Sequence, residues 1–201
     1  MVRILIADDQ GMIRSALATL LGMEPDFEIV AQLDSGQAIL AAARQARPDV
    51  ALLDVEMPGG DGLTAAQALH AEFPECHILI LTTFGRPGYL RRAMDAGASG
   101  FVLKDGPVEN LIRAIREVLG GRKVIDPALA TAAIAAGPNP LTARERDVLA
   151  ASADGSSVAD VAARLYLSEG TVRNYISVVI GKTGTRNRME AVRAATDRGW
   201  I

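Results

Sequence analysis

The sequence has a single cysteine, few aromatic residues and no long apolar run. Cys76 cannot form a disulfide within the chain, which excludes the small secreted folds that depend on disulfides. No apolar run reaches the roughly 18 residues needed to cross a bilayer, and Met1-Val-Arg-Ile leads straight into a strand-like segment instead of a signal peptide. These absences predict a cytoplasmic protein in which Cys76 is a buried core residue and not a reactive thiol.

Apolar residues are plentiful, since they make up 49% of the 201 residues, although aromatic residues supply only 4%. A chain of this length is expected to form one or two domains with cores of Ala, Leu, Val and Ile. Residues 1–139 carry 12 Lys and Arg against 17 Asp and Glu, a net charge of −5, whereas residues 140–201 carry 9 against 7, a net charge of +2. Two parts of the chain with net charges of opposite sign indicate separate binding partners. The positive charge of residues 140–201 is too weak, by itself, to indicate that they bind nucleic acid.

Residues 1–119 repeat one pattern five times, a short apolar run followed by a segment with helical spacing. The pattern predicts strands at 2–7, 27–33, 50–54, 77–82 and 100–104, and helices at 10–22, 35–45, 63–72, 87–96 and 108–119. Strands that are continuous apolar runs and alternate with helices are typical of a parallel sheet covered on both faces. We therefore expect an α/β fold, a flavodoxin-like five-stranded parallel sheet in the order 2-1-3-4-5.

Three acids follow two of these strands: Asp8 and Asp9 end the first, and Asp54 ends the third. In the expected strand order these ends lie side by side at the crevice where such sheets bind ligands. Carboxylates within about 4–6 Å of one another repel, so a proton or a cation must neutralise them. Mg²⁺ suits such a site because it accepts one or two carboxylates and also binds phosphate oxygens. An aspartate beside it can attack phosphorus and form an acyl phosphate.

The ends of the fourth and fifth strands add Thr82, whose hydroxyl can bond a phosphoryl oxygen, and Lys104, whose ammonium can pair with another. Each residue alone has an ordinary explanation. A strand-terminal Thr is usually a turn residue, a strand-terminal Lys is usually a solvated charge, and the acids could cap the helices that follow. Their common position at carboxyl ends of different strands favours a phosphoryl-transfer site.

Asp8-Asp9, Asp54 followed by Met57-Pro58, Thr82, and Gly100-Phe101-Val-Leu-Lys104 together resemble the receiver domain of two-component response regulators, over residues 1–121. The resemblance implies that a sensor histidine kinase phosphorylates Asp54 and that Asp8, Asp9, Asp54 and the backbone carbonyl of Glu56 bind Mg²⁺. It also implies that Lys104 pairs with the phosphoryl group and that Thr82 and Phe101 form the switch. One departure is Asp105, where the family often has proline, and the sequence leaves open whether the Lys104–Asp105 bond is cis.

Residues 122–139 read as a linker, with an Ala-rich patch at 128–136 that is either a short helix or a flexible tether ending at Gly137-Pro138. Beyond it, Thr142, Ser157, Ser168 and Asn187 are N-cap residues for four helices, the first reaching about Ala153 and the third running through about Lys182. Two of the helices are joined by a tight turn. This arrangement predicts a four-helix helix-turn-helix domain over residues 140–201.

In the third of these helices, Val172, Ile176 and Val179 have the spacing of a core-facing side. Arg173, Asn174 and Ser177 then share the outer side near the helix start, where a recognition helix presents side chains to the major groove. Arg can bridge guanine and Asn can bridge adenine, each contributing about 1–3 kcal/mol of discrimination. Thr171 and Lys182 are placed as phosphate contacts. A solvated face on a structural helix is the alternative.

Residues 141–149, Leu-Thr-Ala-Arg-Glu-Arg-Asp-Val-Leu, and residues 168–177, Ser-Glu-Gly-Thr-Val-Arg-Asn-Tyr-Ile-Ser, resemble the LuxR-type DNA-binding domain. With the receiver, this resemblance indicates a NarL/FixJ-type regulator that binds double-stranded DNA as a homodimer after phosphorylation. Residues 82–89, 172–177 and 198–200 are similar to a thermosensing branch of that family concerned with a membrane-lipid desaturase. Gly181, and Thr183 in place of the usual Leu, predict a frayed end to the recognition helix.

Two other functions fit parts of the sequence. An aspartate-nucleophile phosphohydrolase also combines an acid, Mg²⁺, Thr and Lys, but it needs its nucleophile on the first strand and a second acid two residues later. A LuxR regulator that responds to a small ligand would need a ligand pocket in place of the acidic crevice. The position of Asp54 on the third strand argues against the first function, and the acids argue against the second.

Overall fold

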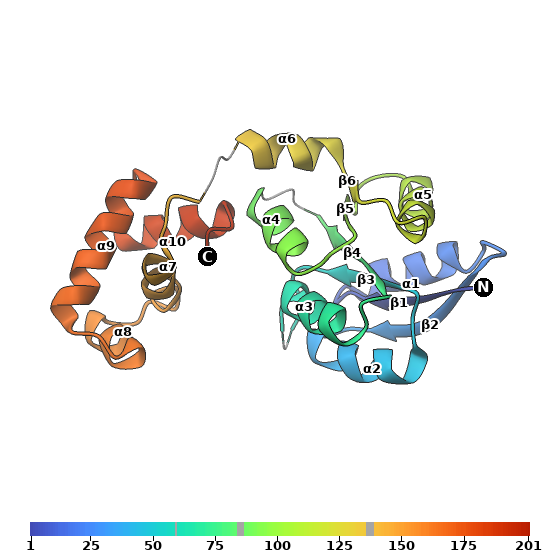
Figure 1. Cartoon of the computed structure of the whole chain (residues 1–201), viewed down its shortest axis with the longest axis horizontal. Coiled ribbons are helices and arrows are strands. Elements are labelled where there is room, and N and C mark those ends of the chain that lie inside the picture. The colour runs from blue at the N-terminus through green and yellow to red at the C-terminus, as the bar shows by residue number, and fades with distance from the viewer. Residues whose placement is uncertain (59, 84–86, 136–138) are drawn as a thin grey trace. The chain divides into compact units, whose positions relative to one another are not determined.

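In a computed structural model, the chain divides into two compact units. The structure describes residues 1–58, 60–83, 87–135 and 139–201. Residues 1–131, apart from 86–88, make the N-terminal unit, and residues 132–201 make the C-terminal unit (Figure 1). Each unit has its own hydrophobic cores.

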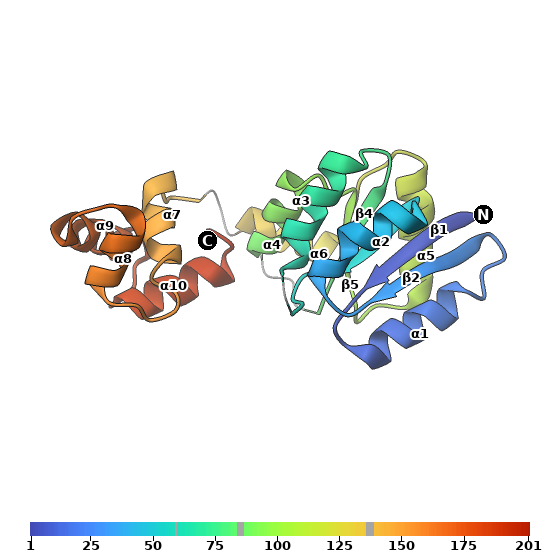
Figure 2. The same cartoon turned by 90° about the horizontal axis from the view of Figure 1, so that it is seen from below.

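The N-terminal unit is built on a parallel sheet in the order β2-β1-β3-β4-β5-β6. Its strands are β1 (Val2–Ala7), β2 (Phe27–Leu33), β3 (Val50–Asp54), β4 (His77–Thr82), β5 (Gly100–Leu103) and β6 (Val124–Ile125). Neighbouring β1 and β2 can be followed in Figure 2. The predicted order of five strands is confirmed, and β6 extends it. A run of two residues carries no periodic pattern, so this sixth strand had no signal in the sequence.

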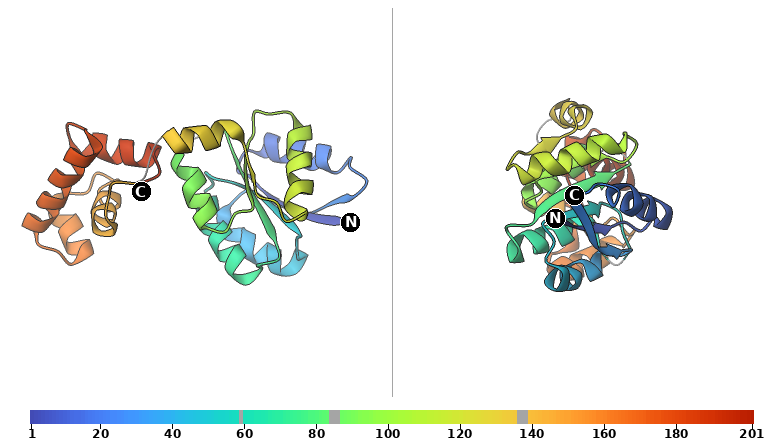
Figure 3. Two further views of the ribbon diagram at one scale, coloured as in Figure 1. Left: turned by 45° about the horizontal axis from the view of Figure 1, so that its top comes forward. Right: turned by 90° about the vertical axis from the view of Figure 1, so that its right-hand side faces the viewer.

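Helices connect the strands by crossovers. They are α1 (Gly11–Leu21), η1 (Gly36–Ala38), α2 (Ile39–Ala46), α3 (Gly62–Glu72), α4 (Pro87–Asp95) and α5 (Val108–Leu119). Helices α1 and α5 contact each other on one face of the sheet, and α2 contacts α3 on the other (Figure 3). With all strands parallel and both faces covered, the carboxyl ends of β1, β3, β4 and β5 share one edge.

Burial in this unit follows the apolar runs. All five residues of β3 are buried, and the cluster under α1 and α5 joins Ile4, Ile6, Leu52, Leu79, Leu81, Leu111 and Ile115. Cys76 is buried as predicted, and burial raises the pKa of its thiol to about 12. No helix in the described ranges is long and apolar enough to cross a membrane.

Helix α6 (Pro127–Ala135) occupies the Ala-rich patch and includes the division between the two units after Thr131, while Gly137-Pro138 lies outside the described residues. Beyond it, the C-terminal unit is helical. Helices α7 (Ala143–Ala150), α8 (Val158–Leu165), α9 (Glu169–Thr183) and α10 (Arg188–Asp197) follow. The four predicted N-caps are confirmed, because each side-chain oxygen accepts a backbone N–H in the first turn of its helix.

One predicted helix end was wrong, that of α7, and the predicted end of α9 is confirmed to within one residue. Helix α7 stops at Ala150 and continues only as turns, in which the buried Ser152 donates to the carbonyl of Val148 at 2.7 Å. Helix α9 was predicted to run through about Lys182. It reaches Thr183, whose buried hydroxyl donates to the carbonyl of Val179 at 2.8 Å, and a left-handed Gly184 then ends it. A hydroxyl that satisfies a carbonyl of the preceding turn anchors the last turn.

Candidate functional site

The carboxyl ends of β1 and β3 bring Asp8, Asp9 and Asp54 together, with one oxygen of each carboxylate within 4.8 Å of the others. Asp8 and Asp54 are buried, and Asp9 is exposed. The backbone N–H of Gln10 donates to Asp8 Oδ1 at 2.9 Å, and the N–H of Val55 donates to Asp54 Oδ1 at 2.8 Å. Each buried acid is therefore oriented by its own loop, and its second oxygen faces the cluster.

Lys104, directly after β5, extends its ammonium between the two buried acids. Its Nζ lies 2.7 Å from Asp8 Oδ2 and 2.9 Å from Asp54 Oδ2, and its side chain is 4% exposed. Neither Lys104 Nζ nor Asp8 Oδ2 makes an aligned hydrogen bond to any described residue. Both atoms are buried and have bonding capacity left for a ligand.

The charges in this cluster do not balance, because one ammonium faces three carboxylates. Burial raises the pKa of Asp54 and the Asp8 carboxylate adds to the rise, while the Lys104 ammonium and the Val55 N–H oppose it. The three converging oxygens and the unsatisfied Asp8 Oδ2 fit a small hard cation such as Mg²⁺.

The other predicted site residues lie around this cluster. Thr82 ends β4 as a buried residue, and its carbonyl accepts the N–H of Lys104 at 2.8 Å. Phe101 is fully buried on β5. Glu56 is exposed, and its carboxylate accepts the hydroxyl of Tyr89 at 3.0 Å. The described residues include no cis peptide bond, so the Lys104–Asp105 bond is trans.

Glycine at position 62 is required by the geometry of the loop after Asp54. A Cβ on Gly62 would overlap the backbone carbonyl of Asp54, and the N–H of Gly62 donates to the carbonyl of Val55 at 2.9 Å. Helix α3 therefore starts directly against the end of β3. The sequence contained this glycine, but nothing in its spacing identified the close approach.

In the C-terminal unit, α8 and α9 form the predicted helix-turn-helix. Val172 and Val179 are fully buried, whereas Arg173, Asn174 and Ser177 are exposed along one side of α9. Arg173 pairs with Glu169 one turn earlier at 2.6 Å, but both side chains are about half exposed or more, so the pair adds little stability. Thr171 is half-buried, with its hydroxyl 2.8 Å from the Ser168 hydroxyl.

Lys182 lies in an ion pair that the sequence did not predict. Its Nζ contacts both oxygens of Glu145, at 2.8 and 2.7 Å, while Glu145 Oε2 also accepts the N–H of Thr142 in the capping box of α7. Burial raises the pKa of Glu145, but Lys182 and Thr142 outweigh burial and lower it overall. The pair joins α9 to α7, and its partners are 37 residues apart, so no local pattern identified it.

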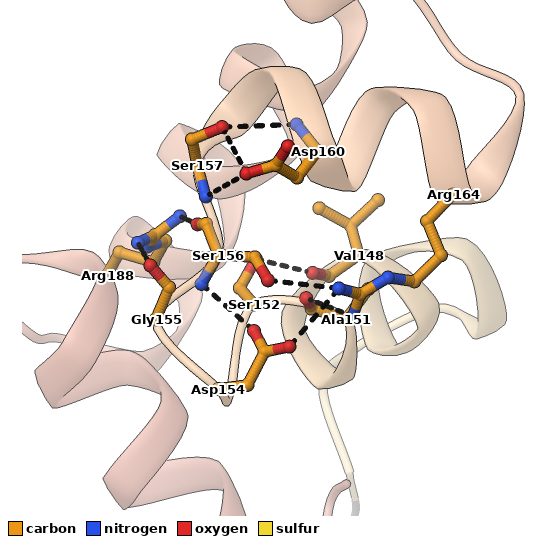
Figure 4. Close-up of polar contacts among 10 residues, drawn as sticks. All are labelled: Val148, Ala151, Ser152, Asp154, Gly155, Ser156, Ser157, Asp160, Arg164 and Arg188. Carbon is orange, nitrogen blue, oxygen red and sulfur yellow. Dashed lines mark hydrogen bonds and ion pairs between the residues drawn. The ribbon is translucent and has the colours of Figure 1, made fainter.

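Two arginines from different helices bind the loop between α7 and α8 (Figure 4). Arg164 donates to the carbonyl of Ala151 at 3.1 Å, to Asp154 at 3.2 Å and to Ser156 at 3.0 Å, and Arg188 donates to the carbonyl of Ser156 at 2.7 Å. The hydroxyl and N–H of Ser156, with Arg164, lower the pKa of Asp154 to about 2. This loop fixes α8, the helix that precedes the recognition helix.

Comparison with known families agrees with this geometry. Residues 4–116 match the family described as "Response regulator receiver domain", and residues 139–195 match "Bacterial regulatory proteins, luxR family". The first match contains all of the acidic cluster and Lys104, and the second contains α7, α8 and α9.

Three relatives cover both units. The chain is 44% identical to the transcriptional regulatory protein DesR of Bacillus subtilis, over 100% of this chain and 100% of DesR. It matches the response regulator ChrA of a heme-sensing two-component system with a TM-score of 0.60 and 32% identity, over 100% of this chain and 98% of ChrA. It also matches RcsB of Salmonella enterica serovar Typhimurium, bound to a promoter in the presence of the phosphomimetic BeF₃⁻, with a TM-score of 0.72 and 25% identity over 98% of each chain. The chain therefore belongs to the response regulators of the NarL/FixJ type, transcription regulators that join a receiver domain to a LuxR-family DNA-binding domain.

Proposed function

We propose that Asp54 accepts a phosphoryl group from a sensor histidine kinase and that the phosphorylated chain dimerises and binds a specific DNA sequence. We also propose the boundaries of the parts: a receiver at residues 1–121, a linker at 122–139 and a DNA-binding domain at 140–201. The observation that carries the proposal is the unbalanced cluster of Asp8, Asp9 and Asp54 around Lys104.

In the proposed transfer, an oxygen of Asp54 attacks phosphorus, the P–N bond of the kinase phosphohistidine breaks, and the imidazole leaves with the bonding electrons and is then protonated. Asp8, Asp9, Asp54 and the carbonyl of Glu56 would hold Mg²⁺, which neutralises charge on the phosphoryl oxygens when bound. Lys104 supports this role because its buried ammonium has unused hydrogen-bonding capacity beside Asp54. Beyond slow loss of the phosphoryl group to water, we expect no enzymatic turnover.

The switch would use residues on the neighbouring strand ends. Thr82 is buried at the end of β4, next to β5, and its hydroxyl would bond the phosphoryl group. Phe101, on β5 and paired with β4 at Ile80, would adjust its packing with that movement. Both would bias an existing equilibrium between two receiver conformations, changing the surface near α1 and α5.

DNA recognition would follow at the exposed side of α9. Arg173 and Asn174 would contact base edges, and Ser177 lies one turn further on, as expected for a recognition helix. Thr171 and Lys182 would contact phosphates, Lys182 with the part of its side chain that Glu145 leaves exposed. The promoter complex of RcsB with a phosphomimetic supports coupling between the two parts. Such a regulator would work in the cytoplasm, with its DNA.

Phosphorylation is tested by incubating the full chain with a small phosphodonor and Mg²⁺ and measuring its intact mass. Wild type is expected to gain one base-labile phosphoryl group, and Asp54→Asn none. Asp34→Asn is the matched control, since Asp34 is an exposed acid directly after β2 and outside the cluster. Undiminished labelling of Asp54→Asn would show that Asp54 is not the phosphoacceptor.

DNA recognition is tested by selecting a duplex from a random library and comparing it with an unrelated duplex. We expect Arg173→Ala to lose most of the discrimination, about 1–3 kcal/mol for one base contact. Arg193→Ala, an exposed arginine on α10, is the control and should keep it. Equal discrimination by wild type and Arg173→Ala would refute the role of Arg173.

A further inference from the structure

The backbone at the end of α8 is unusual within this chain. The N–H of Leu167 bonds the carbonyl of Ala162 at 2.9 Å, and the N–H of Tyr166 bonds that of Ala163 at 3.4 Å. These two bonds form a Schellman motif, which requires a left-handed residue at the position of Tyr166. Tyr166 has φ 56° and ψ 45°, a conformation that is strained for a bulky side chain.

Four other helices of the described chain end in the same pair of hydrogen bonds, and each has glycine at this position. They are α4 with Gly97 (φ 85°), α5 with Gly121 (φ 79°), α9 with Gly184 (φ 66°) and α10 with Gly199 (φ 61°). Glycine adopts this conformation without a steric cost. The end of α8 therefore has tyrosine at a position where these four helices have glycine.

The described residues include one further left-handed residue that is not glycine, Arg47 at the end of α2 (φ 44°). Its side chain has a contact within the fold, since the guanidinium lies over the ring of Phe73 at 5.1 Å from the centroid. Tyr166 is different. It is 95% exposed, and its side chain makes no hydrogen bond or ring contact with any described residue.

The residues on either side explain why Tyr166 points to solvent. Leu165 and Leu167 are both partly buried against the cluster of Val148, Val161, Ala162 and Val172. With its neighbours anchored in the core, the residue between them is held outward. Its backbone is held in place, because Ser168 caps α9 immediately afterwards. The fold therefore directs an aromatic side chain into solvent at the start of the recognition helix.

We propose that Tyr166 is a DNA-backbone contact whose hydroxyl donates to a phosphate at the edge of the major groove, a role that rests on the proposed DNA binding. In a helix-turn-helix the first helix crosses the backbone and the start of the second enters the groove. Tyr166 lies at the junction of these helices, α8 and α9. Tyrosine hydroxyls are among the groups that position proteins on phosphates, and they carry no sequence information there.

The test measures the affinity of the full chain for a selected duplex and for an unrelated duplex, together with its thermal stability. Tyr166→Phe removes only the hydroxyl and is expected to weaken binding to both duplexes by about tenfold, the size of one hydrogen bond to a charged acceptor. Tyr166→Gly should weaken binding at least as much and yet raise Tm by a few degrees, because glycine relieves the strained backbone.

Arg173→Ala separates this proposal from the proposed function. It is expected to lose discrimination between the duplexes, whereas both Tyr166 variants keep the ratio and lose affinity for each. Wild-type affinity in either Tyr166 variant overturns the proposal while leaving DNA binding intact. A loss confined to the dimer, seen by light scattering with unchanged DNA affinity per dimer, also overturns it, because Tyr166 would then contact a second copy. Failure of wild type to bind any duplex refutes the proposed function itself.

Discussion

Each unit places a lysine against carboxylates, and the two arrangements differ in what they leave unsatisfied. In the N-terminal unit, Lys104 is 4% exposed and faces three acids without an aligned hydrogen bond. In the C-terminal unit, Lys182 is 34% exposed and bonds both oxygens of one acid, Glu145. The first cluster has bonding capacity left for a ligand, and the second completes its own network. The buried cluster around Lys104 is therefore suited to bind a ligand, whereas the pair of Lys182 and Glu145 mainly joins α9 to α7.

The two units also differ in how their helices are capped. In the C-terminal unit, α7, α8, α9 and α10 all have side-chain caps, two of them as complete capping boxes. In the N-terminal unit, α1, α2 and α5 have none, and Asp61 caps α3. The small helical unit secures its helix ends locally, whereas the sheet unit depends on buried apolar strands.

The largest expected effect is that of Lys104→Met. It leaves the buried Asp8 and Asp54 without their cation, so we expect the N-terminal unit to lose about 3–5 kcal/mol of unfolding free energy, measured by urea denaturation without Mg²⁺. Added Mg²⁺ should restore part of the loss by binding the same acids. Lys123→Met, an exposed lysine before β6, is the control. A loss below about 1 kcal/mol, the size expected for an exposed ion pair, would contradict the view that Lys104 is the buried cation that Asp8 and Asp54 require.

A smaller effect is expected for Glu145→Ala, which removes the acceptor for Thr142 N–H and Lys182. Lys182 keeps access to water, so the expected loss is about 1–2 kcal/mol, that of a helix cap. The single tryptophan, Trp200, is buried in the C-terminal unit, so its fluorescence during urea unfolding reports on that unit alone. Glu169→Ala, in an exposed pair, should change stability by less than about 0.5 kcal/mol. Equal losses in Glu145→Ala and Glu169→Ala would contradict the larger contribution that we assign to the ion pair of Glu145.

The smallest effect concerns Asp154. Its folded-state pKa of about 2 lies below the usual value of about 4, so it stabilises the C-terminal unit above pH 4 and that contribution is lost as pH falls to about 2. Trp200 fluorescence should give a higher urea midpoint for wild type than for Asp154→Asn at pH 6, and a smaller difference at pH 3. A constant difference across this range would contradict the role of Asp154.

The sequence was sufficient to predict the features that repeat along the chain and the residues that converge at one edge of the sheet. Five apolar runs located β1 to β5, and parallel strands necessarily bring Asp8, Asp54 and Lys104 to one edge. Ser157 and Asn187 were identified as caps because a cap depends on a few neighbouring residues.

Features set by distant contacts or by a single dihedral angle were not predictable. The partnership of Lys182 with Glu145 joins helices 37 residues apart, and the left-handed backbone of Tyr166 follows from packing of the leucines beside it. Strand β6 exists because β5 offers an edge to Val124–Ile125, which a two-residue run does not reveal.

In the proposed mechanism, phosphorylation at Asp54 controls DNA binding by the C-terminal unit. The direct measurement is the affinity of the full chain for its selected duplex, with and without a small phosphodonor and Mg²⁺, in wild type, Asp54→Asn and Asp34→Asn. We predict that wild type and Asp34→Asn gain about tenfold or more, within the usual range of coupling between sites, and that Asp54→Asn gains nothing. An equal gain in Asp54→Asn, or no gain in wild type that carries the phosphoryl group, would contradict it.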